Sequence, residues 1–343
     1  MTVEVRSGAG LSSEAWDSQV RRGAGWSHFH LSGWKDVIER VFGHECPYVV
    51  AVADGGELHG VLPLVRLRSR LFGHYLVSMP FVNYGGPLGS AAAVRRLTDH
   101  AVDLARASRV DVLEFRSRVP LDLDLEVSHR KITVVLDLPQ GDAAGLWKAL
   151  PSKVRSQVRR PQKEGVTVAF GPDQLDPFYH VFARHMRDLG TPVQSRQLFR
   201  RILATFPDDV WFGCAYVNGR PIAGGCGFVW GNEFEMTWAS ALREFNAIAP
   251  NMMLYWSFIE RCVERGLGSF NFGRCTPGGG THKFKRQWGG RDEPLWWYQW
   301  RAGRRSGTPS AGEGAFSWGP RIWSHLPVTV ANRLGPRIVR SIP

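Results

Sequence analysis

The chain has 343 residues, of which 43% are hydrophobic, and its formal net charge is +12. This length favours two domains of ordinary size, and the apolar content excludes a largely disordered chain. No apolar run approaches the roughly 20 residues that a membrane-spanning helix needs, and Met1–Gly10 lacks the apolar segment of a signal peptide. We therefore expect a cytoplasmic protein.

The positive charge indicates an anionic partner, and the distribution of that charge along the chain indicates which class of partner to expect. Residues 301–343 hold seven arginines and one glutamate, so this tail supplies +6 of the total of +12. Because the rest of the chain is only mildly basic, we expect no DNA partner. The five cysteines are widely spaced and form no C-x-x-C pair, so the sequence predicts neither a disulfide framework nor a metal site.

The first half of the chain predicts an alternation of helices and strands. Apolar residues at helical spacing between Leu31 and Phe42 predict a helix. After it we expect a hairpin, a strand, a glycine-rich loop, a helix and a strand, at 48–53 with 58–68, 75–79, 83–87, 91–108 and 110–115.

The second half repeats this order. The turn dipeptide Asn218-Gly219 joins two apolar runs and predicts a hairpin. The expected elements are two helices, the two strands of the hairpin, a strand, a helix and two further strands, at 178–189, 198–206, 210–217, 221–230, 234–239, 250–265, 269–272 and 295–300. A repeated order of elements indicates two similar domains, with two unrelated α/β domains as the alternative.

We thus expect an α/β (α+β) fold in which each domain is a mixed sheet flanked by helices. The expected domains are 1–145 and 146–303, followed by a linker and a basic tail at 304–343. Tryptophans, prolines and arginines alternate with apolar residues in that tail, so it can lie on the body of the protein, on a membrane surface or on a partner.

A basic run opens the second domain. If Pro161 does not break the helix, Arg155, Arg159 and Lys163 share one helical face. Such a row of cations suits phosphate groups, and its alternative is an ordinary solvated face.

The stretch 271–290 is the most informative in the chain. It leaves a strand, crosses a glycine-rich loop, and holds four Lys or Arg residues and three aromatic residues. Glycines allow close backbone approach, and cations can balance developing negative charge. This indicates either a substrate site or merely a turn. On an earlier strand, Glu233 and Glu235 share one face. One of them can act as a base, or both can keep an exposed edge strand soluble.

Three familiar motifs are missing. The chain has no G-x-x-x-x-G-K-[ST] loop and no G-x-S-x-G elbow. It also lacks the [QR]-x-x-G-x-[GA] loop that holds the acetyl-CoA pyrophosphate in single-domain acetyltransferases, which weighs against plain acetyl-CoA as the donor.

Five segments together resemble the FemAB family of transferases over nearly the whole chain. The Phe284–Gly289 segment resembles the family's Phe-Lys-x-x-[aromatic]-Gly pattern. The other four are 155–166, 250–273, Arg187-Asp188-Leu189-Gly190-Thr191-Pro192, and Trp323 to Pro336. The last two are similar to the FemAB-like proteins associated with exosortase/PEP-CTERM and exopolysaccharide loci.

The resemblance implies two tandem N-acetyltransferase-like (GNAT-type) domains and transfer of an activated acyl or aminoacyl group onto an amine of a cell-envelope or exopolysaccharide precursor. Peptidoglycan-bridge members of the family use aminoacyl-tRNA and a muramyl-peptide precursor. The sequence leaves the donor open between aminoacyl-tRNA and an acyl-CoA or acyl-carrier, with no permanently bound cofactor. The alternative is an inactive transferase-fold scaffold at the inner membrane, with the basic tail in peripheral contact with anionic lipid.

The resemblance implies roles for Lys285, Arg155 and Arg159, and the proposed reaction adds the other expected site residues. Lys285 matches the lysine that stabilises the charged intermediate in the family, and His282 is expected as a second catalytic residue that orients donor or acceptor. No protein nucleophile is required, because the donor arrives activated. The expected substrate-binding residues are Arg155, Arg159, Lys163, Arg274, Thr276 and Phe284, with Asn83 and Tyr84 from the first domain.

Overall fold

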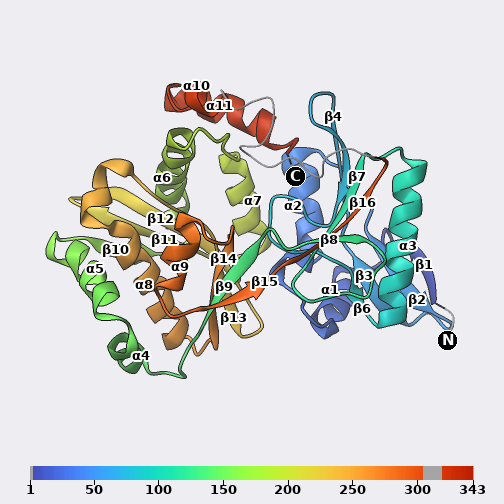
Figure 1. The fold of residues 1–343 in the computed structure, drawn as a ribbon, viewed down its shortest axis with the longest axis horizontal. Coiled ribbons are helices and arrows are strands. Elements are labelled where there is room, and N and C mark those ends of the chain that lie inside the picture. The colour runs from blue at the N-terminus through green and yellow to red at the C-terminus, as the bar shows by residue number, and fades with distance from the viewer. Residues whose placement is uncertain (1–2, 304–318, 343) are drawn as a thin grey trace. The chain divides into compact units, whose positions relative to one another are not determined.

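The computed structural model describes residues 3–303 and 319–342, which form both helices and strands (Figure 1). Contacts divide the chain into two compact units. Within the described ranges, unit 1 consists of 3–130, 294–303 and 340–342, and unit 2 of 131–293 and 319–339. No helix in these ranges is long and apolar enough to cross a membrane.

Unit 1 contains two sheets, with the strand orders β1-β2-β3-β6 and β4-β5-β7-β16-β8. Its longest helix, α3, is capped by Ser90 and buries Ala93, Leu97 and Ala101 along one stripe. That stripe faces β1, β2 and β3 in the unit's apolar core. The elements are β1 (Val3–Ser7), α1 (Ser13–Arg22), α2 (Gly33–Phe42), β2 (Val49–Ala53), β3 (Leu58–Leu62), β4 (Val65–Ser69), β5 (Gly73–Val77), β6 (Leu88–Gly89), α3 (Ala91–Ala107), β7 (Val112–Ser117), β8 (Glu126–Ser128) and β16 (Trp296–Arg301).

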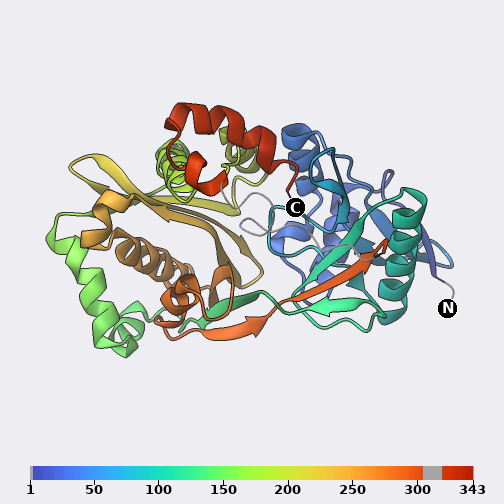
Figure 2. The ribbon, with the colours of Figure 1, turned by 45° about the horizontal axis from the view of Figure 1, so that its top comes forward.

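Unit 2 is built on one sheet of seven strands, in the order β10-β11-β12-β13-β14-β9-β15. Helices α6 and α8 both pack on β11, β12 and β13, and Figures 1 and 2 show them on opposite faces of the sheet. The elements are β9 (Ile132–Asp137), α4 (Ala143–Ala149), α5 (Ser152–Lys163), β10 (Thr167–Phe170), α6 (Leu175–Asp188), α7 (Arg196–Thr205), β11 (Val210–Val217), β12 (Arg220–Trp230), β13 (Glu233–Ala241), α8 (Pro250–Glu264), β14 (Ser269–Cys275), α9 (Gly280–Arg286), β15 (Arg291–Pro294), α10 (Gly319–Trp323) and α11 (Val328–Val339).

The expected elements of unit 2 correspond closely to the observed ones. The hairpin of β11 and β12 turns at Asn218 and Gly219, whose φ angles of 49° and 72° are those of a type I′ turn. In unit 1 the expected strand 58–68 is instead two strands, β3 and β4, which belong to different sheets.

The domain boundaries differ from the expected 145 and 303 because the two halves of the chain exchange strands. β9 comes before the expected boundary but pairs with β14 in unit 2. β16 comes from the second half of the chain but pairs with β7 in unit 1. The expected strand 295–300 is therefore a strand of the first unit.

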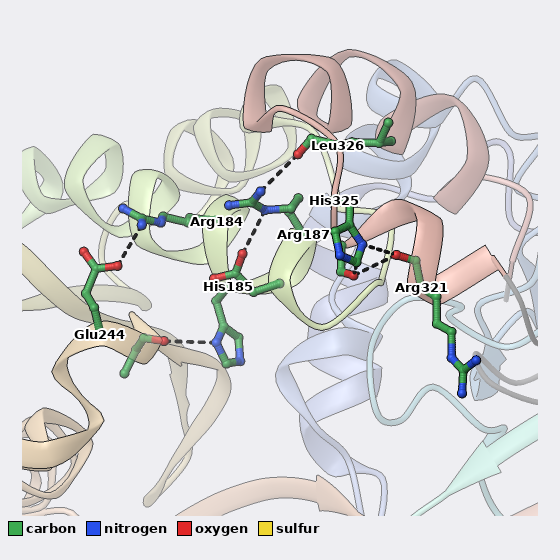
Figure 3. Close-up of polar contacts among 10 residues, drawn as sticks. Arg184, His185, Arg187, Glu244, Arg321, His325 and Leu326 are labelled. Carbon is green, nitrogen blue, oxygen red and sulfur yellow. Dashed lines mark hydrogen bonds and ion pairs between the residues drawn. The ribbon is translucent and has the colours of Figure 1, made fainter.

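The end of the tail is helical and packs on unit 2. In Figure 3, Arg187 at the end of α6 donates from Nη1 to the Leu326 carbonyl at 3.0 Å. A Cβ on Gly335 of α11 would lie 2.8 Å from the Val193 nitrogen, so only glycine allows this approach. The two resemblance segments 187–192 and 323–336 thus form one contact. The expected linker at 304–318 lies outside the described residues.

Gly190 permits the second close approach of the tail, and its replacement is expected to be more costly than that of a matched glycine. Gly190 and Gly219 have nearly equal φ angles of +73° and +72°. An alanine in this conformation costs about 1–2 kcal/mol at either position. At Gly190 its Cβ would also lie 2.4 Å from the Pro320 carbonyl oxygen, whereas at Gly219 no atom lies within 4 Å.

We expect Gly190→Ala to lower the free energy of unfolding more than Gly219→Ala, and to expose the tail to limited proteolysis. Urea denaturation and digestion of the two variants check this. Equal losses of stability, with an equally protected tail, would contradict the observed contact.

Candidate active site

Two neighbouring strands of unit 2, β13 and β14, separate close to the predicted site. They pair in parallel only where Glu233–Glu235 faces Ser269–Asn271. Both strands continue further, β13 to Ala241 and β14 to Cys275. Beyond Asn271 their facing edges therefore hold no ladder hydrogen bonds with each other, and an extended ligand with amide groups can pair with such edges.

Buried polar side chains fix the point of separation. Thr133, Glu235 and Asn271 are fully buried. The Asn271 Oδ1 accepts from the Thr133 hydroxyl and from the Gly273 N–H, and its Nδ2 donates to the Glu233 carboxylate at 2.9 Å. Buried polar groups outside the secondary-structure ladder call for a specific role. Here the hydrogen bonds of Asn271 hold the end of β14 in a defined position.

One sequence interpretation changes as a result, and two residues of the site are new. β13 lies between β12 and β14, so the edge-strand explanation of Glu233 and Glu235 is wrong. Asn271 and Thr133 were not among the predicted site residues. The signal that could have found Asn271 is a polar residue between Phe270 and Phe272 in an otherwise apolar strand.

Lys285 on α9 reaches the end of β14. Its side chain is only 4% exposed, and its Nζ donates to the carbonyl oxygens of Gly273 at 2.6 Å and Arg274 at 3.0 Å. Gly273 has a φ of +72°, which lets β14 turn so that both carbonyls face the amine. An ammonium group has three N–H donors, so one is left for a substrate oxygen.

The charge state of Lys285 is strongly perturbed. Its pKa is lowered to about 8, chiefly by burial and also by the charge of Arg274, while Cys275 and Glu235 oppose the shift. Perturbed groups of this kind cluster at functional sites. Near neutral pH the amine is still mainly protonated, but it lies close to its titration point.

His282 is held in place by two partners. The Gly278 N–H donates to its Nδ1 at 3.0 Å, so the ring proton lies on Nε2, which donates to Asp292 at 3.0 Å. Because both nitrogens are engaged, the geometry favours a role in positioning the 276–282 loop. The catalytic role of His282 stays a prediction. Asp292 was not predicted from the sequence.

A hollow of about 240 Å³ is lined by Arg274, whose carbonyl oxygen accepts the hydrogen bond from Lys285. Lys131 closes one side of it and donates to the Thr276 hydroxyl at 2.8 Å. Two predicted binding residues, Arg274 and Thr276, thus line the same hollow. The lining residues are Lys131, Arg274, Cys275, Thr276, Gly279, Gly280 and Thr281. The predicted Phe284 is half-buried and packs on Tyr255 with ring centroids 5.0 Å apart.

The basic row is a continuous helical face, but it is not part of this cluster. α5 continues through Pro161 to Lys163 as required. Arg155 donates to the Lys148 carbonyl at 2.7 Å, and Arg159 lies 5.5 Å above the Trp147 ring. In Figures 1 and 2, α8 lies between α5 and α9. Phosphate binding by Arg155, Arg159 and Lys163 stays a prediction.

Asn83 and Tyr84 belong to unit 1 and are buried there. The Tyr84 ring packs against Phe29, and the Arg118 guanidinium lies 5.2 Å from its centroid. Their predicted contact with substrate is untested. A larger hollow, of about 690 Å³, also lies in unit 1 between α3, residues 122–125 and Trp300, and it contains none of the predicted residues.

Residues 151–286 match the model of the acetyltransferase (GNAT) domain family. The matched range includes β10 to β14, α8 and Lys285. A comparison with curated protein sequences finds no match.

Solved structures with a similar fold extend over most of the chain. FemX is 15% identical, with a TM-score of 0.64 over 86% of this chain and 97% of its own. L-PGS from Bacillus licheniformis is 10% identical, with a TM-score of 0.55 over 86% and 93%. A tandem GNAT protein from the clavulanic acid biosynthesis pathway is 14% identical, with a TM-score of 0.52 over 89% and 100%. The expected fold, α/β with two tandem GNAT-type domains, is confirmed.

Proposed function

We propose that the protein is an acyltransferase that moves an activated acyl or aminoacyl group from an ester or thioester onto an amine of a phosphate-bearing cell-envelope or exopolysaccharide precursor. The observation that carries this proposal is Lys285, a buried amine held by the carbonyls of Gly273 and Arg274 inside a segment that matches the acetyltransferase domain family. Arg274 also lines a hollow of about 240 Å³.

The proposed reaction needs no protein nucleophile. The acceptor amine attacks the donor carbonyl carbon, and the carbonyl oxygen becomes negatively charged. When the intermediate collapses, the C–N bond remains, the C–O or C–S bond breaks, and the amine's proton passes to the leaving oxygen or sulfur. The Lys285 ammonium group stabilises the oxyanion, an effect typically worth ~3 kcal/mol per donor.

Two donor classes remain in the proposal. The separated edges of β13 and β14 suit a donor with amide groups, such as the pantetheine arm of an acyl-CoA or acyl-carrier. The FemAB resemblance supports aminoacyl-tRNA, for which the basic face of α5 offers phosphate contacts. The exosortase/PEP-CTERM association rests on the segments 187–192 and 323–336.

Mass spectrometry of ligands retained by the gently purified protein tests the proposal, together with transfer assays using acyl-CoA and aminoacyl-tRNA. We expect one donor class to be retained or consumed by the wild-type protein. An empty site and no transfer from either donor would favour the inactive scaffold instead.

The pH dependence of transfer tests the role of Lys285. The proposed active form is protonated, and the pKa of Lys285 in the folded protein is about 8. We therefore expect kcat/KM to be constant below this pH and to fall as the pH rises through it, after correction for ionisation of the acceptor amine. A rise through the same pH would instead make Lys285 a general base.

A further inference from the structure

The C-terminal helices carry a group of exposed residues that we call the tail face: Arg321 and Ile322 on α10, and Val330, Arg333, Leu334 and Arg337 on α11. On α11 the exposed positions 330, 333, 334 and 337 form one stripe, while Ala331 and Gly335 are buried on the opposite side. Exposed fractions of 57% for Ile322, 39% for Val330 and 40% for Leu334 are large for aliphatic side chains.

The aliphatic side chains of the tail face are concentrated rather than scattered. Six large hydrophobic residues are exposed in the described part of the chain, and three of them belong to this face. A fourth, Leu189, precedes Gly190, whose added Cβ would touch Pro320 of α10. Single exposed apolar residues need no explanation, but a group of them marks an interaction site.

The charge of the tail face has one sign. Arg321, Arg333 and Arg337 make no ion pair with any residue that the structure describes. Residues 319–342 contain no aspartate or glutamate. The surface therefore attracts an anionic partner, and its arginines are free to meet it.

The tail face is also held in a fixed position on unit 2. Arg187 binds the Leu326 carbonyl, and Gly190 and Gly335 allow close contact with Pro320 and Val193. Figures 1 and 2 show α10 and α11 lying over α6. The face is thus preformed and does not have to fold on binding.

We propose that the tail face binds the surface of an anionic lipid bilayer, with the three arginines on the headgroups and the aliphatic side chains at the acyl boundary. Aliphatic insertion combined with basic attraction is the pattern of interfacial helices. RNA is the weaker alternative, because single strands are read by cations and stacked aromatic rings, and aliphatic side chains gain nothing from phosphates.

This inference goes beyond the proposed activity and does not depend on it. α11 has 12 residues, so at about 1.5 Å per residue it is far too short to span a bilayer and would lie on the surface. Such placement would bring unit 2 to acceptors carried on membrane lipids.

Vesicle flotation of the full chain tests the proposal, with phosphatidylcholine vesicles that contain or lack phosphatidylglycerol. We expect flotation only with the anionic vesicles. Replacing Arg321, Arg333 and Arg337 by Gln should weaken binding about fivefold per arginine. Replacing Ile322, Val330 and Leu334 by Ser should also abolish flotation, although the charge is unchanged.

Matched controls separate the face from general surface effects. Leu71→Ser removes an aliphatic side chain that is 80% exposed in unit 1. Replacing the exposed Arg22, Arg70 and Arg265 by Gln removes the same charge elsewhere. We expect both controls to float like the wild type. All substituted residues are exposed, so we expect every variant to fold, and thermal melts check this.

Two outcomes would overturn the proposal. Flotation of the triple Ser variant at wild-type levels would show that the aliphatic residues do not contact lipid. Binding of tRNA in gel shifts that is lost in the triple Gln variant but kept in the triple Ser variant, without flotation of the wild type, would assign the face to nucleic acid.

Discussion

Lys285→Met is expected to lower acyl transfer by at least a hundredfold while leaving the protein as stable as the wild type, or more stable. Removal of one preorganised donor to a developing oxyanion typically costs about 10²–10³ in kcat. Stability should not suffer, because burial lowers the pKa of Lys285 from 10.5 to about 8. That shift corresponds to about 3 kcal/mol by which folding disfavours the charged form.

The sign follows from linkage. The folded protein binds fewer protons than the unfolded chain between pH 8 and pH 10.5, so the stability contributed by Lys285 rises with pH across this window. Near neutral pH the buried charge is unfavourable, and methionine, of similar length and apolar, removes it. Replacing the lysine also removes its hydrogen bonds to the Gly273 and Arg274 carbonyls, and this loss offsets part of the gain in stability.

Lys283→Met is the matched control. Lys283 is exposed, lies two positions before Lys285 in the same helix and does not belong to the candidate site. We expect wild-type kcat from this variant. Steady-state kinetics and thermal unfolding of the two proteins test the prediction. Full activity of Lys285→Met would remove the lysine from the mechanism.

The sequence was most informative where a local pattern decides a local structure. The amphipathic helices and the hairpin at Asn218-Gly219 follow from residue spacing and turn chemistry, and their observed bounds agree closely. The exchange of β9 and β16 could not be predicted in this way. Each pairs with a strand far away in the chain, and strand periodicity says nothing about which partner is chosen.

The site was predicted in part. The Phe-Lys pattern identified Lys285, but its burial depends on α9 folding back onto β14. Tertiary structure also brings three further residues to that segment: Lys131, Thr133 and Asp292. Thr133 lies in the exchanged strand β9 and Lys131 directly precedes it, and neither belongs to a recognisable motif. Conversely, Arg155 and Arg159 form the expected helical row, but a row of cations does not specify the part of the fold it faces.

A buried ion pair within β7 contacts the exchanged strand β16, and we expect Glu114→Ala to be the most destabilising of the proposed changes. Glu114 and Arg116 of β7 are 0% and 2% exposed, and Arg116 Nε lies 2.8 Å from the Glu114 carboxylate. Gln299 of β16 donates to the other carboxylate oxygen at 2.6 Å. The Arg116 guanidinium also lies 4.6 Å from the centroid of the Trp297 ring, which belongs to β16.

Removing Glu114 leaves the Arg116 charge buried without its carboxylate and leaves the Gln299 amide without its acceptor. Breaking a buried pair in this way costs about 3–5 kcal/mol. Urea denaturation should therefore show a loss of this size for Glu114→Ala. Glu126→Ala provides the comparison, because Glu126 also meets β16, through Arg301, but is mostly exposed, and surface pairs contribute only about 0–1 kcal/mol.

A double variant shows whether the charge or the packing is responsible. Replacing Glu114 by Leu together with Arg116 by Met fills the same space without charge, and such replacements are often neutral in stability. We expect the double variant to unfold at a higher urea concentration than Glu114→Ala alone. If it is instead less stable than the single variant, the contacts of Arg116 with the Val82 carbonyl and the Trp297 ring outweigh the cost of its unpaired charge, because the Gln299–Glu114 hydrogen bond is absent from both variants.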